Sequence, residues 1–265
     1  MISGIVTVVS NQRSVMILKK NCENREMMKS NFNLMKEIET DQSKEIPQPP
    51  LQKPFDGNVD RIKLPEFGEE IILDNNLLHC LKKRRSHRKF KDESLSLKEL
   101  SFLLWSTQGI DEIRGDNYAT IRPVPSAGAR HPFETYLLIN NIDGLEKGIY
   151  RYLPLTHELL FLFTNDEMVK KVEKITFRQK FVATAPVLFI WSCIPYRGEW
   201  RYSIASHKAM LLDAGHVCQN LYIASEAIGS GTCAIAAYDQ EAIDKLIEVD
   251  GEEEFVVYMS PVGKV

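Results

Sequence analysis

The chain has 265 residues, of which 44% are hydrophobic and 26% are charged, and its formal net charge is −3. This composition is that of an ordinary globular protein, and the length suits one large domain or two small ones. Because the net charge is small, the whole surface cannot serve to bind polyanions, so any anion site must be a local patch.

The chain contains five cysteines, and no CxxC or Cys/His pair has the spacing of a zinc site. The odd number argues against a disulfide framework, so we expect free thiols in a reducing compartment and no bound metal. No apolar stretch reaches the roughly 18 residues of a membrane span, and the N-terminus lacks the basic region of a secretory signal. The sequence therefore predicts a cytoplasmic protein without membrane contact.

Residues 1–67, called the arm below, are poor in core residues. Two short strands are expected at 5–9 and 14–18, followed by a helix over 23–40 with methionines near one face. Five prolines then occur from residue 45 to the end of the arm. Because proline fixes φ and lacks a donor, this stretch predicts an extended linker rather than an independent domain.

Residues 68–265 form the expected main domain, in which helices and strands mix without a regular βαβ order. Leucines spaced from Leu73 to Leu81 predict a helix that ends near Arg85. Ser96 and Glu99 form the capping-box pattern that starts a second helix. Further strands are expected over residues 135–139, 149–152, 159–163, 186–191 and 254–260, and shorter helices over residues 166–174 and after Asp239.

The longest predicted helix covers residues 202–228, and Gly229 suits the position after its end. It is apolar on most sides, which predicts burial all round, at the centre of the domain or at a subunit interface. The mixture of elements predicts an α+β layered fold. Three polar residues at helical spacing are interpreted as hydrogen-bonded buried groups rather than as a catalytic relay: Asp213, His216 and Asn220.

A basic run, KKRRSHRKFK, occupies residues 82–91. Arg84, Arg85 and Arg88, with Ser86, offer charge-assisted donors that match phosphate oxygens. The run follows the C-terminal end of a helix, whose dipole repels anions, so side chains would have to hold a phosphate. Composition alone favours a solvated basic face, and a nuclear-localisation or nucleic-acid patch is a further alternative. The absence of other basic clusters argues against nucleic acid.

A second stretch, RPVPSAGARHPFETYLLIN, covers residues 122–140. Its small residues, with Pro125, Ser126 and Gly128 at the centre, would let a flat ligand approach the backbone closely. The alternative is a proline-rich loop before a strand, and this is the better interpretation of the stretch taken alone.

A third stretch, IGSGTCAIAAYDQEAI, covers residues 228–243. It does not follow a strand with GxGxxG spacing, which excludes a Rossmann motif. Its small side chains, among them Ala236 and Ala237, would leave backbone amides free to bond the edge of a ring system. A tight, close-packed connection explains the same residues equally well.

Together these motifs resemble the nitroreductase family, and most closely its SagB-type branch, which includes thiazoline and oxazoline dehydrogenases of peptide tailoring. The order and spacing of the motifs over residues 73–265 carry the resemblance, which covers the arm much less. The matching segments are RRSHR at 84–88, PSAGARHP at 125–132, DAGHVCQN at 213–220, GTCAI at 231–235 and PVGK at 261–264.

The resemblance implies a nitroreductase-like three-layer αβα domain with a mainly antiparallel sheet and a long buried central helix. It also implies a domain-interlocked homodimer with FMN bound at the interface. By position, the family's RxSxR-type segment assigns the FMN phosphate to Arg84, Ser86 and Arg88, with Arg85 beside them and Lys264 as a further partner. The remaining assignments place Pro125, Ser126 and Gly128 along the isoalloxazine, and the backbone of Ala236 and Ala237 near flavin N5.

One departure bears on the reaction. The azoline dehydrogenases carry a Lys-Tyr pair before the central helix for acid/base chemistry, and the matching positions here are Arg201 and Tyr202. Arginine stays protonated and is a poor base, whereas tyrosine can exchange a proton. We therefore expect hydride transfer between NAD(P)H and a small organic acceptor, such as a nitro compound or quinone, by a ping-pong mechanism. The alternatives are an FMN-dependent dehydrogenase of a modified peptide or natural product, a flavin-binding scaffold and a nucleic-acid binder.

Overall fold

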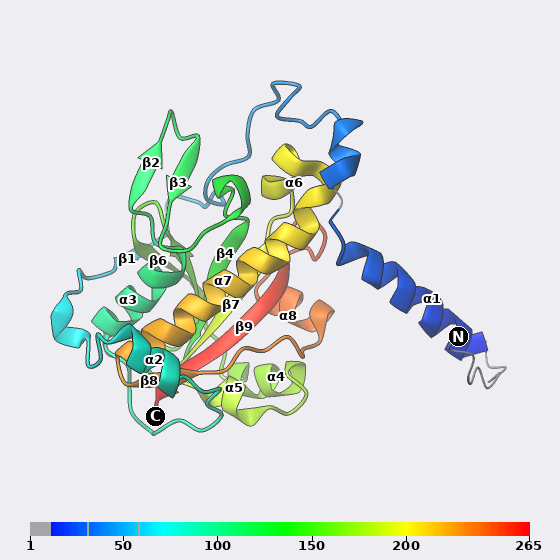
Figure 1. The fold of residues 1–265 in the computed structure, drawn as a ribbon. Helices are drawn as coiled ribbons and strands as arrows, with labels where there is room; N and C mark the ends of the chain where they lie inside the picture. The colour runs from blue at the N-terminus through cyan, green and yellow to red at the C-terminus, as the bar shows by residue number, and fades with distance from the viewer. Residues whose placement is uncertain (1–11, 31, 58) are drawn as a thin grey trace.

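The computed structural model describes residues 12–30, 32–57 and 59–265 (Figure 1). Its centre is a seven-stranded sheet in the order β1-β6-β5-β4-β7-β9-β8, and all of its strand pairs are antiparallel. The strands are β1 (Arg61–Lys63), β4 (Phe133–Ile139), β5 (Gly148–Leu153), β6 (Glu158–Phe163), β7 (Val187–Cys193), β8 (Ser230–Thr232) and β9 (Phe255–Lys264). A separate hairpin joins β2 (Glu112–Arg114) to β3 (Ala119–Ile121).

Helices cover both faces of the sheet, which gives three layers (Figure 1). One buried cluster joins the sheet to α3 (Leu97–Gln108) and α7 (Ser206–Ala227), with α2 (Leu77–Lys83) packed against α7. A second cluster joins the other face to α4 (Met168–Ile175), α5 (Lys180–Thr184) and α8 (Gln240–Leu246). The predicted α+β fold, with its nitroreductase-like αβα layers and mainly antiparallel sheet, is confirmed.

The central strands are buried on both faces, which explains why they read as nearly continuous apolar runs. Along β4, Phe133, Leu137 and Ile139 contribute to the first cluster, and Tyr136 and Leu138 to the second. This split follows the two-residue period of a strand, whose successive side chains point to opposite faces. The five predicted strands correspond to β4, β5, β6, β7 and β9, and β9 extends to Lys264.

Two helix starts follow the local rules of capping. The Ser96 Oγ accepts from the Glu99 amide at 3.2 Å, and the Glu99 carboxylate accepts from the Ser96 amide at 2.8 Å, so the capping box is confirmed. Asp239 likewise caps α8 by accepting from the Ala242 amide at 3.1 Å. The helix expected from Leu73 instead begins at Leu77, because Asn76 provides its cap.

The arm differs from its predicted elements. The strand expected at 14–18 is wrong, because α1 (Gln12–Met27) is helical there, and residues 5–9 lie outside the described residues. The helix expected over 23–40 is also wrong beyond Met27, since a separate 3-10 turn, η1 (Phe32–Lys36), follows it. A strand needs a partner, and the Lys, Leu, Glu and Met content of this segment suits a helix better. Figure 1 shows α1 projecting away from the sheet.

The longest predicted helix corresponds to α7, which begins at Ser206 rather than at Tyr202. A short helix that was not predicted, α6 (Tyr196–Tyr202), and a 3-10 turn, η4 (Ser203–Ala205), precede it. Ser203 breaks the path with φ +41 and ψ −132, and Gly229 follows the other end with φ +65, as its predicted position requires. Within one chain α7 is not buried all round, because Leu211 is 49% and Leu212 57% exposed. That part of the prediction is wrong for the single chain.

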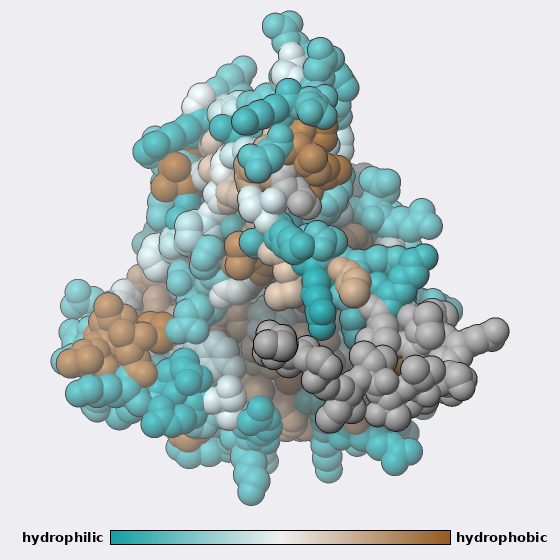
Figure 2. All heavy atoms as spheres, turned by 45° about the vertical axis from the view of Figure 1, so that its right-hand side comes forward, coloured by the Kyte–Doolittle hydropathy of each residue, from teal (hydrophilic) through white to brown (hydrophobic). Residues whose placement is uncertain are grey.

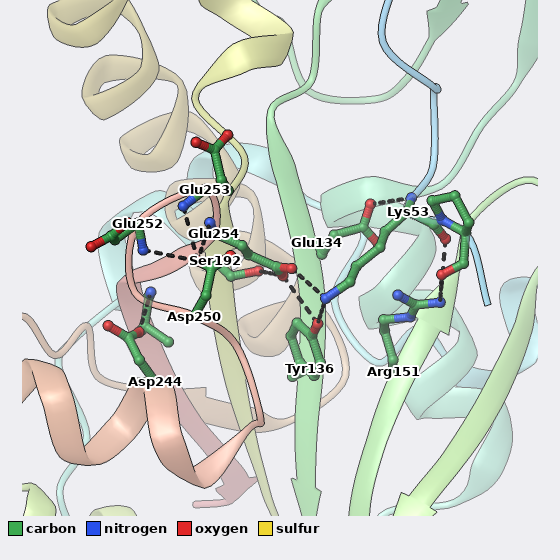
Figure 3. A network of polar contacts seen from close by, with 12 residues as sticks. Lys53, Glu134, Tyr136, Arg151, Ser192, Asp244, Asp250, Glu252, Glu253 and Glu254 are labelled. Atoms are coloured by element: carbon green, nitrogen blue, oxygen red, sulfur yellow. Dashed lines mark hydrogen bonds and ion pairs between the residues drawn. The ribbon is translucent and has the colours of Figure 1, made fainter. Parts of the chain in front are cut away.

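A buried polar network fastens the arm to the sheet (Figure 3). The Lys53 amide donates to Glu134 at 2.8 Å, and its ammonium group contacts the Glu254 carboxylate. Glu254 also accepts from the Tyr136 hydroxyl at 3.0 Å, and Arg151 donates to the Lys53 carbonyl at 3.2 Å. Beyond this anchor the arm contributes β1, which pairs with β6 at the edge of the sheet. No described helix combines the length and apolar character that crossing a membrane would need.

Candidate active site

The RRSHR segment, residues 84–88, lies at the C-terminal end of α7. The Ser86 Oγ is 2.9 Å from the Tyr222 hydroxyl, and the Arg84 guanidinium lies over the Tyr222 ring at 5.3 Å from its centre. Ser86 forms a parallel bridge with Thr232 of β8, and the His87 amide donates to the Thr232 carbonyl at 2.9 Å. Backbone pairing therefore fixes this segment against the end of the sheet.

Two glycines of the recognised motifs make this close approach possible. A Cβ on Gly231 would lie 2.6 Å from the His87 ring, and a Cβ on Gly263 would lie 2.9 Å from Phe90. Both distances are shorter than van der Waals contact, so a larger residue would push the segment off β8 and β9. The glycines thus explain why the motifs around residues 231 and 263 accompany the basic segment.

The three arginines of this segment differ in their partners. The Arg85 Nη1 donates to the carbonyls of Lys82, Lys83 and Arg84 at 2.9, 3.3 and 2.8 Å, so it caps the end of α2. Neither Arg84 nor Arg88 forms an ion pair with any residue that the structure describes. Their guanidinium groups therefore carry positive charge without a carboxylate partner.

Lys264 has a different environment. Its ammonium group contacts the Glu99 carboxylate and donates to the Ile228 carbonyl at 3.1 Å. Its side chain is largely buried between the start of α3 and the end of α7. A role for Lys264 at a phosphate stays a prediction, and it would require the amine to leave Glu99.

The PSAG loop, residues 125–128, lies against the N-terminal half of α7. The Ser126 hydroxyl and the Ala127 amide both donate to Asp213 Oδ2, at 2.7 and 2.9 Å. Burial raises the pKa of the Asp213 carboxyl, and these two hydrogen bonds oppose that rise. Asp213 thus holds the loop in place, while Pro125 stands exposed at its start.

The polar residues of α7 agree only in part with their interpretation as buried groups. Asp213 is buried and hydrogen-bonded, and Asn220 is half-buried and donates to the Ser106 carbonyl at 2.9 Å. His216 is exposed, with its ring 3.8 Å from the Asp213 carboxylate, so the interpretation is wrong for this residue. It occupies the side of α7 that also exposes Leu212, which one chain leaves uncovered.

The predicted pair Arg201 and Tyr202 meets the PSAG loop at Gly128. A Cβ on Gly128 would lie 2.6 Å from the Tyr202 hydroxyl and 3.0 Å from the Arg201 Cδ. Gly128 also has φ +62, a conformation that side chains disfavour. The loop and the end of α6, which are distant in sequence, are thereby brought into one place.

Sequence reasoning missed the residues that complete this cluster. The Arg130 guanidinium lies over the Tyr118 ring at 4.9 Å and the Trp200 ring at 5.4 Å, and donates to the Tyr118 carbonyl at 2.7 Å. The Arg201 Nη1 donates to the Tyr118 hydroxyl at 3.0 Å. Arg130 is part of the PSAGARHP motif, which was the available signal, whereas Tyr118 and Trp200 stand in stretches without any.

Ala236 and Ala237 lie in an irregular stretch between Ile235, which pairs with Met259, and α8. Both are exposed, and the Ala237 carbonyl accepts from Gln179 at 3.3 Å. Their amides donate no hydrogen bond to the described part of the chain. These two donors are therefore free for a ligand, as the sequence interpretation requires.

Known proteins resemble this chain in sequence and in fold. The pattern of the nitroreductase family matches residues 81–264, which is more than half of the chain. The chain belongs to the nitroreductase family. It is 30% identical over 208 residues to MJ1384 of Methanocaldococcus jannaschii, named as a candidate nitroreductase, covering 78% of this chain and 98% of that protein. Because the members of this family are oxidoreductases, this chain is an oxidoreductase.

A second relative agrees with the resemblance to the SagB-type branch of the nitroreductases. The trifolitoxin-processing protein TfxB of Rhizobium leguminosarum bv. trifolii is 26% identical over 133 residues. That match covers 49% of this chain and 36% of TfxB.

Solved structures share the nitroreductase fold at low identity. A candidate nitroreductase from Ralstonia eutropha has a TM-score of 0.64 at 24% identity, covering 83% of this chain and 98% of that chain. One from Anabaena variabilis has a TM-score of 0.66 at 20% identity and 80% coverage of this chain, which spans only 43% of that chain. The Escherichia coli microcin synthetase McbBCD complex with truncated pro-MccB17 has a TM-score of 0.59 at 19% identity, covering 80% and 77%.

Proposed function

We propose that this nitroreductase-family protein binds FMN and transfers hydride between NAD(P)H and a small organic acceptor by a ping-pong mechanism. The observation that carries the proposal is that the guanidinium groups of Arg84 and Arg88, beside Ser86, have no carboxylate partner among the described residues. These groups offer charge-assisted donors at one end of α7, where a phosphate monoester would find several of them together.

The rest of the site fits the same cofactor. The free amides of Ala236 and Ala237 are hydrogen-bond donors suited to the polar edge of a flavin ring. At the other end of α7, the lack of a side chain at Gly128 lets Tyr202 pack directly against the PSAG loop. The donors for the phosphate and the donors for the ring edge therefore come from separate motifs. A long ligand with a phosphate at one end and a ring at the other requires this separation.

FMN, when bound, supplies the hydride chemistry, and the chain supplies binding, orientation and electrostatics. Asp213 keeps the loop in one position by accepting from Ser126 and Ala127. Tyr202 places its hydroxyl at the loop, where it can hold or release a proton at Oη. The Arg201 guanidinium lies over the Tyr202 ring, 5.4 Å from its centre, and orients that ring.

A second copy of the chain is part of the proposal. Figure 2 shows hydrophobic residues in patches on a mostly hydrophilic face. Leu211 and Leu212 on α7 are exposed, as are leucines on and before α2. Exposed apolar side chains gathered in this way are typical of subunit interfaces. We therefore propose a homodimer in which the partner subunit covers these surfaces. The leucines on and before α2, from the most to the least exposed, are Leu73, Leu77, Leu78 and Leu81.

A second candidate is an FMN-dependent dehydrogenase of a modified peptide. Two comparisons favour it, namely the match to a trifolitoxin-processing protein and the fold shared with a microcin synthetase that has a pro-peptide bound. The Arg201–Tyr202 pair argues against azoline oxidation by a lysine base, because arginine does not accept a proton at ordinary pH. A flavin-binding scaffold remains the non-enzymatic alternative.

The deciding experiment is a visible absorption spectrum of the purified protein, followed by titration with NADH or NADPH without oxygen. Flavin bands that bleach are the expected result. Bands that persist would contradict the NAD(P)H reaction and favour the dehydrogenase or the scaffold. A colourless protein that takes up no added FMN would overturn the cofactor assignment.

A further inference from the structure

The N-terminal end of α7 carries a second group of cations, formed by Arg130 and Arg201. In the described ranges, neither arginine forms an ion pair with a carboxylate, although both contact neutral residues. Arg130 rests over Tyr118 and Trp200, and Arg201 lies over Tyr202. The two positive charges are thus held on aromatic faces, with hydrogen bonds to neutral groups.

Arg130 is buried, with only 6% of its surface exposed. Its guanidinium donates to the carbonyls of Gly128 and Tyr118 at 3.1 and 2.7 Å, and to Gln48 of the arm at 3.2 Å. Desolvation lowers the pKa of Arg130, and the charge of Arg201 nearby acts in the same direction. A buried cation beside a second cation is costly without an anion to balance it.

Arg201 is the accessible member of the pair, since it is only half-buried. Its Nη1 donates to the Tyr118 hydroxyl at 3.0 Å, and Gln42 donates to the same oxygen at 2.8 Å. Because that oxygen accepts twice, its own hydrogen is free to be donated outward. A guanidinium and a phenolic hydroxyl therefore lie side by side as donors next to Gly128.

We propose that Arg201 and the Tyr118 hydroxyl bind a carboxylate of the organic substrate at the PSAG loop, with Arg130 as the positioning residue beneath Tyr118. This inference rests on the proposed function and narrows its substrate class to carboxylate-bearing acceptors. A planar carboxylate matches the guanidinium fork and takes the hydroxyl hydrogen with its second oxygen. Of the two arginines, only Arg201 is accessible, and a single guanidinium suits a monoanion better than the pyrophosphate of NAD(P)H.

The arm takes part in this recognition. Gln42 and Gln48 hold Tyr118 and Arg130 from the outer side, and Phe32 packs edge-to-face on Tyr202 at 5.9 Å. The Gln42 amide also donates to the Trp200 carbonyl at 2.9 Å. The donors at Arg201 are therefore oriented by a shell that comes from the arm, the β2–β3 hairpin and α6.

The test compares two probes of nearly the same shape, 4-nitrobenzoate and 4-nitrobenzamide, by isothermal titration calorimetry on the full-length protein as purified. We expect the wild type to bind the carboxylate at least about tenfold more tightly than the amide. Arg201→Gln should remove most of this preference, and Tyr118→Phe, which keeps the charge, should reduce it by about threefold. Arg178→Gln, which removes an exposed arginine elsewhere, should leave it unchanged.

Equal binding of the two probes by the wild type would overturn the inference, as would an Arg201→Gln variant that keeps the preference. Weaker NADPH binding by Arg201→Gln with an unchanged probe preference would assign the cation to the nicotinamide cofactor and also overturn it. The calorimetric preference needs no turnover, whereas the proposed function fails separately, in the flavin spectrum. The two failures are therefore distinguishable.

Discussion

The two arginine groups at the ends of α7 are built in opposite ways. The RRSHR segment places its cations in one short run at the surface, with glycines in β8 and β9 making room for it. The pair Arg130 and Arg201 is assembled from separate elements and rests on aromatic rings. In the exposed run Arg84 lies over the Tyr222 ring but Arg88 does not lie over the ring of any described residue, whereas both guanidinium groups of the second pair are held over rings and so have a set orientation. We therefore assign affinity for the cofactor to the first group and selection of the substrate to the second.

The largest expected effect tests the first group. Replacing both Arg84 and Arg88 with alanine removes two charge-assisted hydrogen bonds, each worth about 1.5–3 kcal/mol. The dissociation constant of FMN should rise roughly 100-fold or more. Fluorescence titration measures it, with FMN added to protein that is free of flavin or that has been unfolded to release its flavin and then refolded. Lys82→Ala with Lys89→Ala removes equal charge from the same surface and should have a small effect. Stoichiometric FMN retained by the arginine variant would sink the phosphate assignment.

The next effect concerns the anchor of the arm, which supports only the second group. Lys53→Met leaves the Glu254 carboxylate, whose side chain is 7% exposed, without its cation. We expect a loss of about 2–3 kcal/mol in the free energy of unfolding, because a buried charge loses its partner. Urea unfolding measures this loss. The preference for 4-nitrobenzoate over 4-nitrobenzamide should also fall, whereas the affinity for FMN should stay the same. Lys98→Met, which breaks an ion pair with Glu70 that is exposed to solvent, should lower the free energy of unfolding much less.

A smaller effect is expected where the loop meets the second group. Gly128→Ala places a Cβ 2.6 Å from the Tyr202 hydroxyl at a residue with φ +62. The combined strain should cost about 2 kcal/mol. Gly144→Ala is the matched control, because Gly144 has φ +80 and nothing within 4 Å of the added carbon. Thermal unfolding should show a larger loss for Gly128→Ala, and equal losses would contradict the close contact.

A separate effect, which appears only when the pH is lowered, concerns His131, which follows Arg130 in the chain. Burial lowers the pKa of His131 to about 3. The unfolded chain binds this proton near pH 6.5, so the stability that His131 contributes is complete above that pH and is lost as the pH falls toward 3. The slope should reach about 1.4 kcal/mol per pH unit. His131→Gln should flatten the dependence of unfolding free energy on pH, and an unchanged slope would show that His131 is protonated in the folded state.

Local patterns were sufficient to predict much of the fold. The strands β4 and β7 were found because burial on both faces leaves a continuous apolar run, and α3 because Ser96 and Glu99 cap it. The break at Ser203, before the start of α7, was missed because neither a proline nor a glycine marks its positive φ in the sequence. The strands β1 and β2 were missed because they are short, polar and largely exposed, and β3 was missed because it is only three residues long although it is mostly buried.

In the candidate site, too, some residues are revealed by local sequence patterns, whereas others are brought together only by the fold. The RRSHR segment was visible because its cations are consecutive, and the resemblance then assigned them to a phosphate. The pair of Arg201 and Tyr202 was visible only by comparison with a family position. Tyr118 and Trp200 could not be predicted, since they gain a role only when the hairpin and α6 bring them against Arg130.

The strand β1 has a practical consequence for how this protein is produced. It belongs to the arm, and it occupies the hydrogen-bonding edge of β6, where Leu159 and Leu160 lie opposite Ile62 and Arg61. A shortened chain that begins at residue 81, where the family match begins, would leave this edge open. Open strand edges pair with other chains, so such a truncated protein should aggregate even though its catalytic motifs are intact.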